Sequence, residues 1–201
     1  SVAGEYGTTF FTVSLAALLV ALHRYTCDTD PRVGVPVANR DRREITGLVG
    51  FFVNTQVLRA RIDRHATLRD LLVQVRDTMF GAQAHQDLPF DLLVDALQPG
   101  RSAGRTPLFD VMAGHQTQRE MPAHALPGLA VNRFRLDDTN APFELTLDTY
   151  ETADGTIDGV FTYASDLFDA QTVARFAAFY DSVLGLLAGD AGRTIDAACG
   201  A

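Results

Sequence analysis

Histidine and cysteine are among the residue types in this chain that could act as a base, a nucleophile or a metal ligand. The histidines number five, none beside another and none at metal-ligand spacing from a cysteine or a carboxylate: His23, His65, His85, His115 and His124. The two cysteines, Cys27 and Cys199, lie near opposite ends of the chain, so they predict neither a disulfide framework nor a zinc site. We therefore expect no metal site in this chain.

Short motifs that carry a complete chemistry are also missing from the sequence. It contains no glycine-rich phosphate loop and no HExxH, paired CxxC or GxSxG pattern. A serine, a histidine and an aspartate from distant positions could still assemble a triad, although nothing local indicates one. His85 and Asp87 have the residue types of a catalytic dyad. Because they lie close together where a helix is expected to begin, we favour a helix cap and a packed, hydrogen-bonded ring.

The composition is that of an ordinary globular protein, and we expect a single domain. Of the 201 residues, 47% are hydrophobic and 21% are charged. The 17 basic and 25 acidic residues give a net charge of -8, and no lysine–arginine cluster is present, so nucleic acid is not an expected partner. The longest apolar run, residues 10–22, is too short to span a membrane, and no basic residue precedes it as in a signal peptide. These features indicate a cytoplasmic protein with no membrane contact.

Helices and strands alternate along the chain according to the apolar spacing. The first expected helix covers residues 10–22, with a cap at Thr8 or Thr9, and the second runs from Leu68 to Met79 behind the capping box Thr67-x-x-Asp70. A third helix is expected from Phe90 to Leu97, with Asp87 near its start and Pro89 in its first turn. The last runs from a cap at Asp169 to Leu187. The expected strands are residues 33–37, 48–58, 108–113, 129–136, 143–148 and 156–164. Phe90 is expected in the core.

These elements predict a layered sandwich of the α/β or α+β class, with helices flanking a mixed, largely antiparallel sheet. Asp154-Gly155 is a hairpin turn signal between the last two strands. Residues 119–127 carry two prolines and no periodicity, so we predict a mobile excursion there. No linker is long enough to divide the chain.

Three segments, in this order, resemble the fifth, sixth and seventh core motifs of condensation domains from nonribosomal peptide synthetases. They are VGFFVNTQ at residues 49–56, HQDLPFD at residues 85–91 and RSAGRTPLF at residues 101–109. Each would be weak alone, but the ordered set is specific, and the resemblance covers nearly the whole chain. It implies one lobe of the fold that is named after chloramphenicol acetyltransferase.

A whole condensation domain in this family has a V shape with two lobes, and its catalytic histidine motif, HHxxxDG, lies in the N-terminal lobe. This chain contains no HH pair and begins where the C-terminal lobe would begin. The resemblance therefore implies a C-terminal lobe spanning residues 1–201, with the N-terminal lobe absent and no catalytic residue in this chain. We expect the lobe to be inactive alone, so whether the chain counts as an enzyme stays open.

The family forms amide bonds between thioesters that two carrier proteins present from opposite sides of the tunnel between the lobes. The reaction is mainly one of orientation, because a thioester is already activated. The resemblance implies that the partners are the N-terminal lobe and the donor and acceptor peptidyl carrier proteins. It implies no directly bound cofactor, since the substrates ride on the phosphopantetheine of the carriers.

The resemblance also suggests roles for individual residues of this chain. Asn54 and Thr55 either offer hydrogen bonds to the pantetheine or satisfy backbone groups at a strand end, and both readings stay open. Gly50 is expected to permit a close approach or a positive φ. The expected sites are the substrate tunnel (Gly50, Phe52, Asn54, Thr55), a structural motif near it (His85, Asp87, Pro89, Phe90) and contacts to the other lobe or a carrier (Arg40, Arg101, Arg105).

Two other functions remain open beside this one. A non-catalytic module could keep the fold and recruit a carrier protein or a tailoring enzyme. An apolar face that the other lobe normally covers could also drive self-association.

Overall fold

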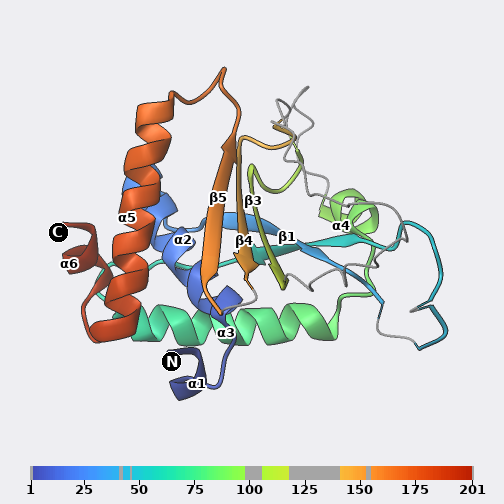
Figure 1. Cartoon of the computed structure of the whole chain (residues 1–201), viewed down its shortest axis with the longest axis horizontal. Helices are drawn as coiled ribbons and strands as arrows, with labels where there is room; N and C mark the ends of the chain where they lie inside the picture. Colours follow the sequence, from blue (N-terminus) through green and yellow to red (C-terminus); the bar gives the residue numbers. More distant parts are fainter. Residues whose placement is uncertain are drawn as a thin grey trace, which may run out of the picture.

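The computed structural model describes residues 2–40, 43–45, 47–97, 106–117, 141–152 and 155–200 (Figure 1). The strands of these residues form one sheet: β1 (Arg32–Val37), β2 (Asn54–Arg59), β3 (Val111–Thr117), β4 (Leu145–Glu151) and β5 (Ile157–Tyr163). The helices are α1 (Val2–Glu5), α2 (Phe10–Thr26), α3 (Leu68–Ala84), α4 (Phe90–Leu97), α5 (Ala170–Gly189) and α6 (Ile195–Cys199), with a short 3-10 turn at Arg43–Ile45. The strand expected at residues 129–136 and the excursion expected at residues 119–127 lie outside the described residues.

The strand order is β2-β1-β3-β4-β5, with β1–β3 and β3–β4 parallel and the two outer pairings antiparallel. The predicted layered α/β fold with a mixed sheet is therefore confirmed, although the described pairings are evenly divided and not largely antiparallel. Because β1, β3 and β4 run in the same direction, their first residues share one edge of the sheet, here called the amino edge. Their last residues share the opposite carboxyl edge, where Asn54 of β2 pairs with Val37 of β1.

Helix α2 is the centre of the helical layer. Thr9, one of the two residues predicted as its cap, accepts a hydrogen bond from the Thr12 amide. Every residue from Thr12 to Leu22 is buried. The helix packs between α3 and α5, so it needs apolar residues on nearly all sides. The core contains α2 together with Val33 of β1 and Leu147 of β4, among others.

The caps of the two other long helices are also confirmed. Thr67 and Asp70 form a reciprocal capping box at α3. The Thr67 hydroxyl, together with the Thr67 amide, donates to the Asp70 carboxylate and lowers the pKa of that carboxyl. At α5 the Asp169 carboxylate accepts a 2.8 Å hydrogen bond from the Thr172 amide, which lowers the pKa of Asp169.

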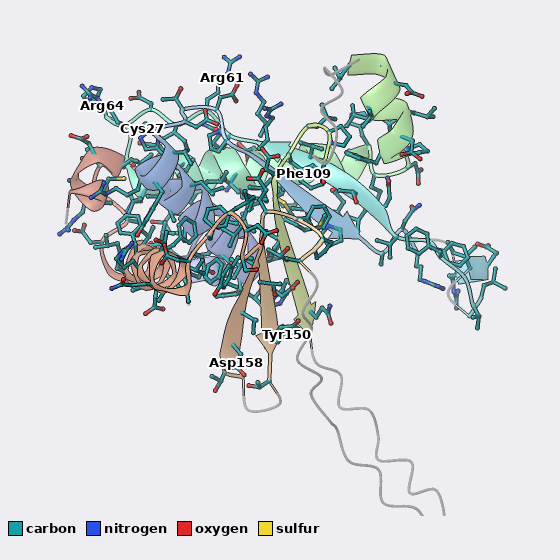
Figure 2. All side chains as sticks on the ribbon, turned by 90° about the horizontal axis from the view of Figure 1, so that it is seen from above. Cys27, Arg61, Arg64, Phe109, Tyr150 and Asp158 are labelled. Carbon is teal, nitrogen blue, oxygen red and sulfur yellow. The ribbon has the colours of Figure 1, made fainter. Side chains whose placement is uncertain are left out.

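The other face of the sheet carries a small aromatic cluster. The Phe109 ring lies against Gly34 of β1, where a Cβ atom would be only 2.4 Å from the ring. Phe90 of α4 and Phe143 contact the same ring, with centroids 5.7 Å and 5.6 Å away. Gly34 is therefore required by the close approach of an aromatic side chain to the sheet. Figure 2 shows Phe109 beside the strands.

The predicted hairpin is confirmed between β4 and β5. Its turn uses Gly155 with a φ of +81°, which favours glycine, whereas Asp154 lies outside the described residues. Tyr150 and Asp158 pair across the two strands and lie together toward the turn of this ribbon (Figure 2).

Three expected strands have wrong boundaries, and the one expected at residues 143–148 lies at Leu145–Glu151. The strand expected at residues 48–58 begins only at Asn54, because residues 47–53 have no strand partner in the described sheet. The strand expected at residues 108–113 begins at Val111, because Leu108 has a φ of +74° that an extended strand does not allow.

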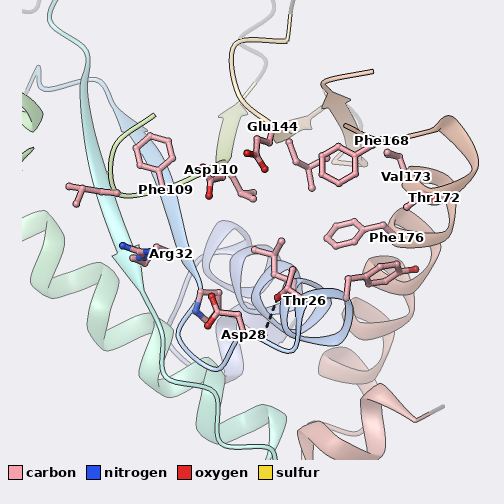
Figure 3. A pocket seen from close by; sticks show the side chains of 16 residues that line it. Thr26, Asp28, Arg32, Phe109, Asp110, Glu144, Phe168, Thr172, Val173 and Phe176 are labelled. Carbon is pink, nitrogen blue, oxygen red and sulfur yellow. Dashed lines mark hydrogen bonds between the residues drawn. The ribbon is translucent and has the colours of Figure 1, made fainter. Parts of the chain in front are cut away.

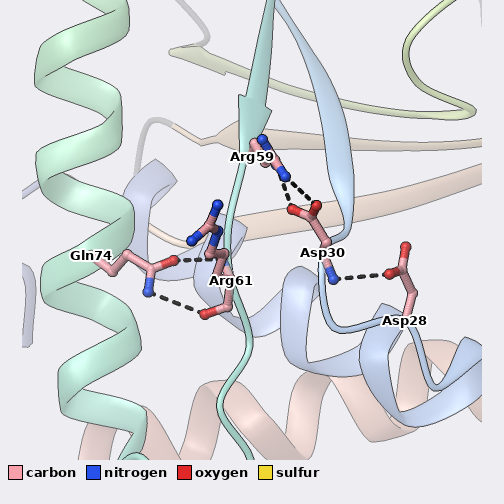
Figure 4. A network of polar contacts seen from close by, with 5 residues as sticks. All are labelled: Asp28, Asp30, Arg59, Arg61 and Gln74. Atoms are coloured by element: carbon pink, nitrogen blue, oxygen red, sulfur yellow. Dashed lines mark hydrogen bonds and ion pairs between the residues drawn. The ribbon is translucent and has the colours of Figure 1, made fainter.

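Polar contacts connect β2, an outermost strand of the sheet, and the residues after it to neighbouring segments (Figure 4). Arg59 at the end of β2 forms an ion pair with Asp30 just before β1, and this hydrogen bond lowers the pKa of the Asp30 carboxyl. The Gln74 side chain of α3 bonds both the amide and the carbonyl of Arg61, at 2.7 Å and 3.1 Å. Within the described residues, no helix is both long and apolar enough to cross a membrane.

Candidate functional site

The side chain of Asn54 joins two of the segments that the sequence singled out. Its Nδ2 donates to the backbone carbonyls of Gln86 and Leu88, at 3.0 Å and 2.8 Å. Its Oδ1 accepts a 3.1 Å hydrogen bond from the amide of Phe90, the first residue of α4. Residues 49–56 and 85–91 are therefore held together at the carboxyl edge by one carboxamide.

Both donors of the Asn54 carboxamide are thus used within the chain, since a primary amide has only two N–H groups. The hydrogen bonds of Asn54 go to backbone groups, which agrees with the alternative prediction that it satisfies the backbone. These groups are, however, more than thirty residues away in sequence and not at the end of its own strand. A contact of Asn54 with a ligand stays a prediction and would have to use the carboxamide oxygen. Thr55, the next residue, is half-buried and pairs with Pro36 of β1.

The expected cap and packed ring at residues 85–91 are wrong. His85 ends α3 and is exposed, as is Asp87, so neither forms a packed group. The amide at the start of α4 is satisfied by the side chain of Asn54 instead. Pro89 is exposed just before the helix, and its carbonyl accepts from the Leu93 amide.

Phe90 is half-buried rather than a member of the main core. It lies on the other side of the sheet from α2, where it meets the edge of the Phe109 ring. The apolar spacing predicted correctly that the Phe90 side chain packs against apolar neighbours. It packs in the aromatic cluster around Phe109 and not in the main core around α2.

Arg40 organises the segment at residues 47–53, here called the arm. Its guanidinium donates to the carbonyls of Ile45, Leu48 and Gly50, at 3.0 Å, 2.8 Å and 3.2 Å. Its Cζ atom also lies 4.3 Å from the centroid of the Phe52 ring. A planar fork with several donors suits this task, because the arm has carbonyls that no strand partner satisfies. The use of Arg40 as a contact to another lobe or a carrier stays a prediction.

Gly50 lies where the arm folds closely on itself. A Cβ atom at this position would be 3.0 Å from the Phe52 ring, while its φ is not in the left-handed region. Of the two expected reasons for this glycine, the structure shows the close approach.

The arm presents apolar side chains to solvent. Val49 and Phe51 are essentially fully exposed, at 104% and 90%, and Leu48 and Val53 are about half-exposed. In Figure 1 the connection between β1 and β2 extends away from α5 and α6, at the far side of the molecule. Apolar side chains on a segment that is held in place by hydrogen bonds indicate a contact surface.

Other expected site residues cannot be placed in this arrangement. Arg101 and Arg105 lie outside the described residues. In the described part of the chain, no group of three or more histidine, cysteine or acidic side chains is arranged to hold a metal.

His115 shows how a lone histidine is accommodated here. Its Nδ1 is 2.9 Å from the Thr149 hydroxyl, which donates its own proton to the Gly114 carbonyl. Nδ1 is therefore the donor to the Thr149 oxygen, because the hydroxyl has only one proton to give. The imidazole also contacts the rings of Phe10 and Phe11.

Sequence reasoning missed a cavity of about 320 Å³ at the amino edge (Figure 3). Its lining comes from the end of α2, the starts of β1, β3 and β4, and the start of α5. Leu108, with its positive φ, forms part of the wall. Leu108 and Phe109 belong to one of the motifs that the sequence singled out, but most of the other lining residues come from four further segments that no spacing rule brings together.

Chemically, the arrangement around Asn54 offers a rigid backbone, an apolar arm and an amide oxygen. These groups can bind and orient a substrate or a partner surface. They do not include an acid or base poised for proton transfer among the described side chains that touch Asn54.

Known proteins resemble this chain in sequence. A family model described as Condensation domain matches residues 1–195. One of the proteins that make up linear gramicidin synthase in Brevibacillus parabrevis is 42% identical over 195 residues, which are 95% of this chain and 4% of that protein. Enniatin synthase of Fusarium equiseti is 35% identical over 181 residues, which are 90% of this chain and 6% of that protein. The chain therefore spans a small part of the curated relatives that it matches.

Solved structures show the same similarity. A four-domain nonribosomal peptide synthetase, holo-AB3403 bound to AMP and glycine, superposes with a TM-score of 0.87 at 25% identity, covering 97% of this chain and 16% of that one. The X-domain from teicoplanin biosynthesis superposes with a TM-score of 0.86 at 26% identity, covering 97% of this chain and 45% of that one.

Proposed function

The chain belongs to the condensation-domain family, and from this premise we propose that residues 1–201 are the C-terminal lobe of a domain that forms amide bonds in nonribosomal peptide synthesis. Its substrates would be aminoacyl or peptidyl thioesters carried on the phosphopantetheine of a donor and an acceptor carrier protein. The reaction would take place in the cytoplasm. The lobe would supply one wall of the tunnel, and the reactive imidazole would come from the N-terminal lobe.

The observation that carries this proposal is the junction at Asn54. Two of the three segments by which the sequence resembles condensation domains are bonded to each other through one side chain, beside an arm of exposed apolar residues. A tunnel wall requires such a rigid frame, because an activated thioester needs positioning more than it needs further activation. The arm, with Phe51 and Val49 exposed, would pack against the N-terminal lobe.

Gly50, Phe52, Asn54 and Thr55 would then face the tunnel from this lobe. His85, Asp87, Pro89 and Phe90 would form the turn that supports them. The side chain of Arg40 would act indirectly, by holding the arm, while Arg101 and Arg105 would reach the other lobe or a carrier protein.

Complementation tests this proposal. The 201-residue chain is mixed with a separately produced N-terminal lobe that contains HHxxxDG, and amide formation is followed between a loaded donor and a loaded acceptor carrier. We expect product from the mixture and none from either lobe alone. A double substitution on the arm, Val49→Ser with Phe51→Ser, should reduce the rate, and Val73→Ser on α3 serves as a control outside the arm. Turnover by the 201-residue chain alone would refute the proposal.

A second candidate is a non-catalytic module that recruits a tailoring enzyme. It is favoured by one structural neighbour, the X-domain in its complex with OxyB from teicoplanin biosynthesis, which superposes with a TM-score of 0.84 at 25% identity. The coding sequence upstream of Ser1 separates the two candidates. An intact HHxxxDG motif supports amide formation, and a degenerate one supports recruitment.

A further inference from the structure

The cavity at the amino edge is separate from the arrangement around Asn54. It lies at the starts of the parallel strands, where Arg32 begins β1 and Leu145 begins β4, whereas Asn54 pairs with the last residue of β1. A ligand in this cavity therefore goes beyond the proposed function and does not depend on it. The volume of about 320 Å³ is within the range of small-molecule sites.

One wall of the cavity is aromatic and aliphatic. Phe168 and Phe176 lie on the side of α5, with Val173 beside them, as Figure 3 shows. Tyr25 at the end of α2 continues this wall, with its ring centroid 5.1 Å from that of Phe176. Phe176 and Val173 are buried, so their apolar surfaces are available only to a group that enters the cavity.

The opposite wall is acidic. Asp110 and Glu144 immediately precede the paired residues Val111 and Leu145, so the two carboxylates lie side by side at the starts of β3 and β4 (Figure 3). Both are half-buried, and both also interact with other groups of the chain. A ligand would therefore share these carboxylates with their present partners.

The charged side chains that line the cavity are mostly acidic. Asp28 adds a third carboxylate at the exposed rim, and among the described lining residues Arg32 is the one cation. The carboxyl end of α2, which contributes Thr26 to the lining, adds a partial negative charge. The positive end of α5 is offset by its capping residue Asp169.

The backbone at Leu108 is a further sign of a built site. A φ of +74° is rare for a branched residue, and it turns the chain so that Leu108 lines the cavity while Phe109 packs on Gly34. Leu108 also lines a second hollow together with Arg59 and Leu97. Strained residues of this kind are concentrated at ligand sites.

We propose that this cavity binds an organic ammonium ion that carries an aromatic or branched alkyl body. The body fills the space against Phe168, Phe176 and Val173. The ammonium group lies beside Asp110 and Glu144, where both the carboxylates and the faces of the aromatic rings attract a cation. An anion of the same shape would meet like charges, and a neutral molecule would lose the charged contacts.

Binding of three probes of one shape to the unmodified 201-residue chain tests the proposal. They are phenethylamine, its neutral counterpart 2-phenylethanol and the anion 3-phenylpropionate, each titrated by calorimetry and by NMR. We expect phenethylamine to bind at least about tenfold more tightly than the alcohol, and the anion not to bind. Ring protons of Phe168 and Phe176 should show NOEs to the phenyl group. Equal binding of amine and alcohol, or NOEs to other residues, would overturn the proposal.

Substitutions of Asp110 and Glu144 test which carboxylates bind the ammonium group. Asp110→Asn and Glu144→Gln keep the side-chain shapes, and each should weaken phenethylamine binding by about tenfold while leaving 2-phenylethanol unchanged. Glu151→Gln is the matched control, because it removes a half-buried carboxylate at the other end of β4. Val173→Phe should abolish binding of both probes by filling the cavity. Equal binding of phenethylamine to Asp110→Asn, Glu144→Gln and the unmodified chain would show that these carboxylates do not hold the ammonium group. The comparison of the three probes on the unmodified chain still tests the proposal if a variant fails to fold.

Discussion

The Asn54 side chain caps a helix that begins far along the chain, since its Oδ1 accepts a 3.1 Å hydrogen bond from the amide of Phe90. A helix usually receives this bond from the residue just before it. Here the first residue of β2 supplies it, so the start of α4 is attached directly to the sheet edge. The same carboxamide holds the carbonyls of Gln86 and Leu88, and the whole α3–α4 turn is therefore positioned by β2.

Asn54→Ala should loosen this turn. The substitution leaves three backbone groups without their partner, and we expect a loss of about 1–3 kcal/mol in the free energy of unfolding. Hydrogen exchange at the Phe90 amide should become faster. Asn54→Asp keeps an acceptor for this amide, so exchange there should stay slow although both donors are lost. Thr55→Ala is the control, and equal protection of Phe90 in Asn54→Ala and the unmodified chain would contradict the cap.

Gly34→Ala should destabilise the sheet. The added Cβ would lie 2.4 Å from the Phe109 ring, which is buried and contacts two other rings, so either the ring or the strand must move. We expect a cost of about 1–3 kcal/mol in urea unfolding. Phe109→Leu should remove part of this cost in the double variant by making room for the methyl group. Additive effects of the two substitutions would show that the ring is not the obstacle.

Local signals predicted the four longer helices, α2 to α5, well, whereas the short helices α1 and α6 were not predicted. The caps at Thr9, Thr67 and Asp169 depend on side chains within three residues of the amides that they satisfy, so the sequence pattern contains the whole interaction. The hairpin at Gly155 is predictable for the same reason, because a φ of +81° favours glycine at that position.

The candidate site was harder to predict because its contacts are not local. The partners of Asn54 are more than thirty residues away, and no spacing rule links them. The apolar residues before Asn54 predicted a strand, but the guanidinium of Arg40 binds two carbonyls of this region, those of Leu48 and Gly50, and residues 47–53 form the arm instead. Leu108, which lines the cavity, has a positive φ that no propensity indicates.

Arg40→Lys should release the arm without unfolding the protein. A lysine ammonium can reach one or two of the carbonyls of Ile45, Leu48 and Gly50, but it has no planar group to lie over Phe52. We expect a stability loss of about 1 kcal/mol and clearly faster hydrogen exchange and proteolysis at residues 47–53. Arg43→Lys in the neighbouring turn is the control. An arm that stays equally protected in Arg40→Lys would show that other contacts hold it.

Asp148 should make the stability depend on pH in a defined direction. Partial burial raises the pKa of its carboxyl above the ordinary value of 3.8. The folded chain therefore takes up this proton at a higher pH than the unfolded chain, so the contribution of Asp148 destabilises the fold above the raised pKa and disappears below the unfolded value. Asp148→Asn should be more stable than the unmodified chain at neutral pH, and the difference should shrink as the pH falls through this window. Urea unfolding at several pH values measures it, and a difference that does not change with pH would contradict the assignment.

The hydroxyls of Ser14 and Tyr180 should be coupled strongly, because they join α2 to α5 inside the core. They are 2.7 Å apart and buried, and burial raises the pKa of the Tyr180 phenol. Tyr180→Phe keeps the ring contact with Phe161 but leaves the Ser14 hydroxyl without this partner, which should cost about 1–3 kcal/mol. Ser14→Ala should cost a similar amount for the opposite reason.

The double variant decides whether these costs come from the pair or from each residue alone. With both hydroxyls gone, no polar group of the pair remains buried, so Ser14→Ala with Tyr180→Phe should be more stable than the sum of the single losses by about 0.5–3 kcal/mol. Tyr163→Phe on β5 is the control, because it removes a half-buried phenol hydroxyl at another place in the fold. Strict additivity in urea unfolding would show that the two hydroxyls act independently, and that the α2–α5 contact depends on apolar packing alone.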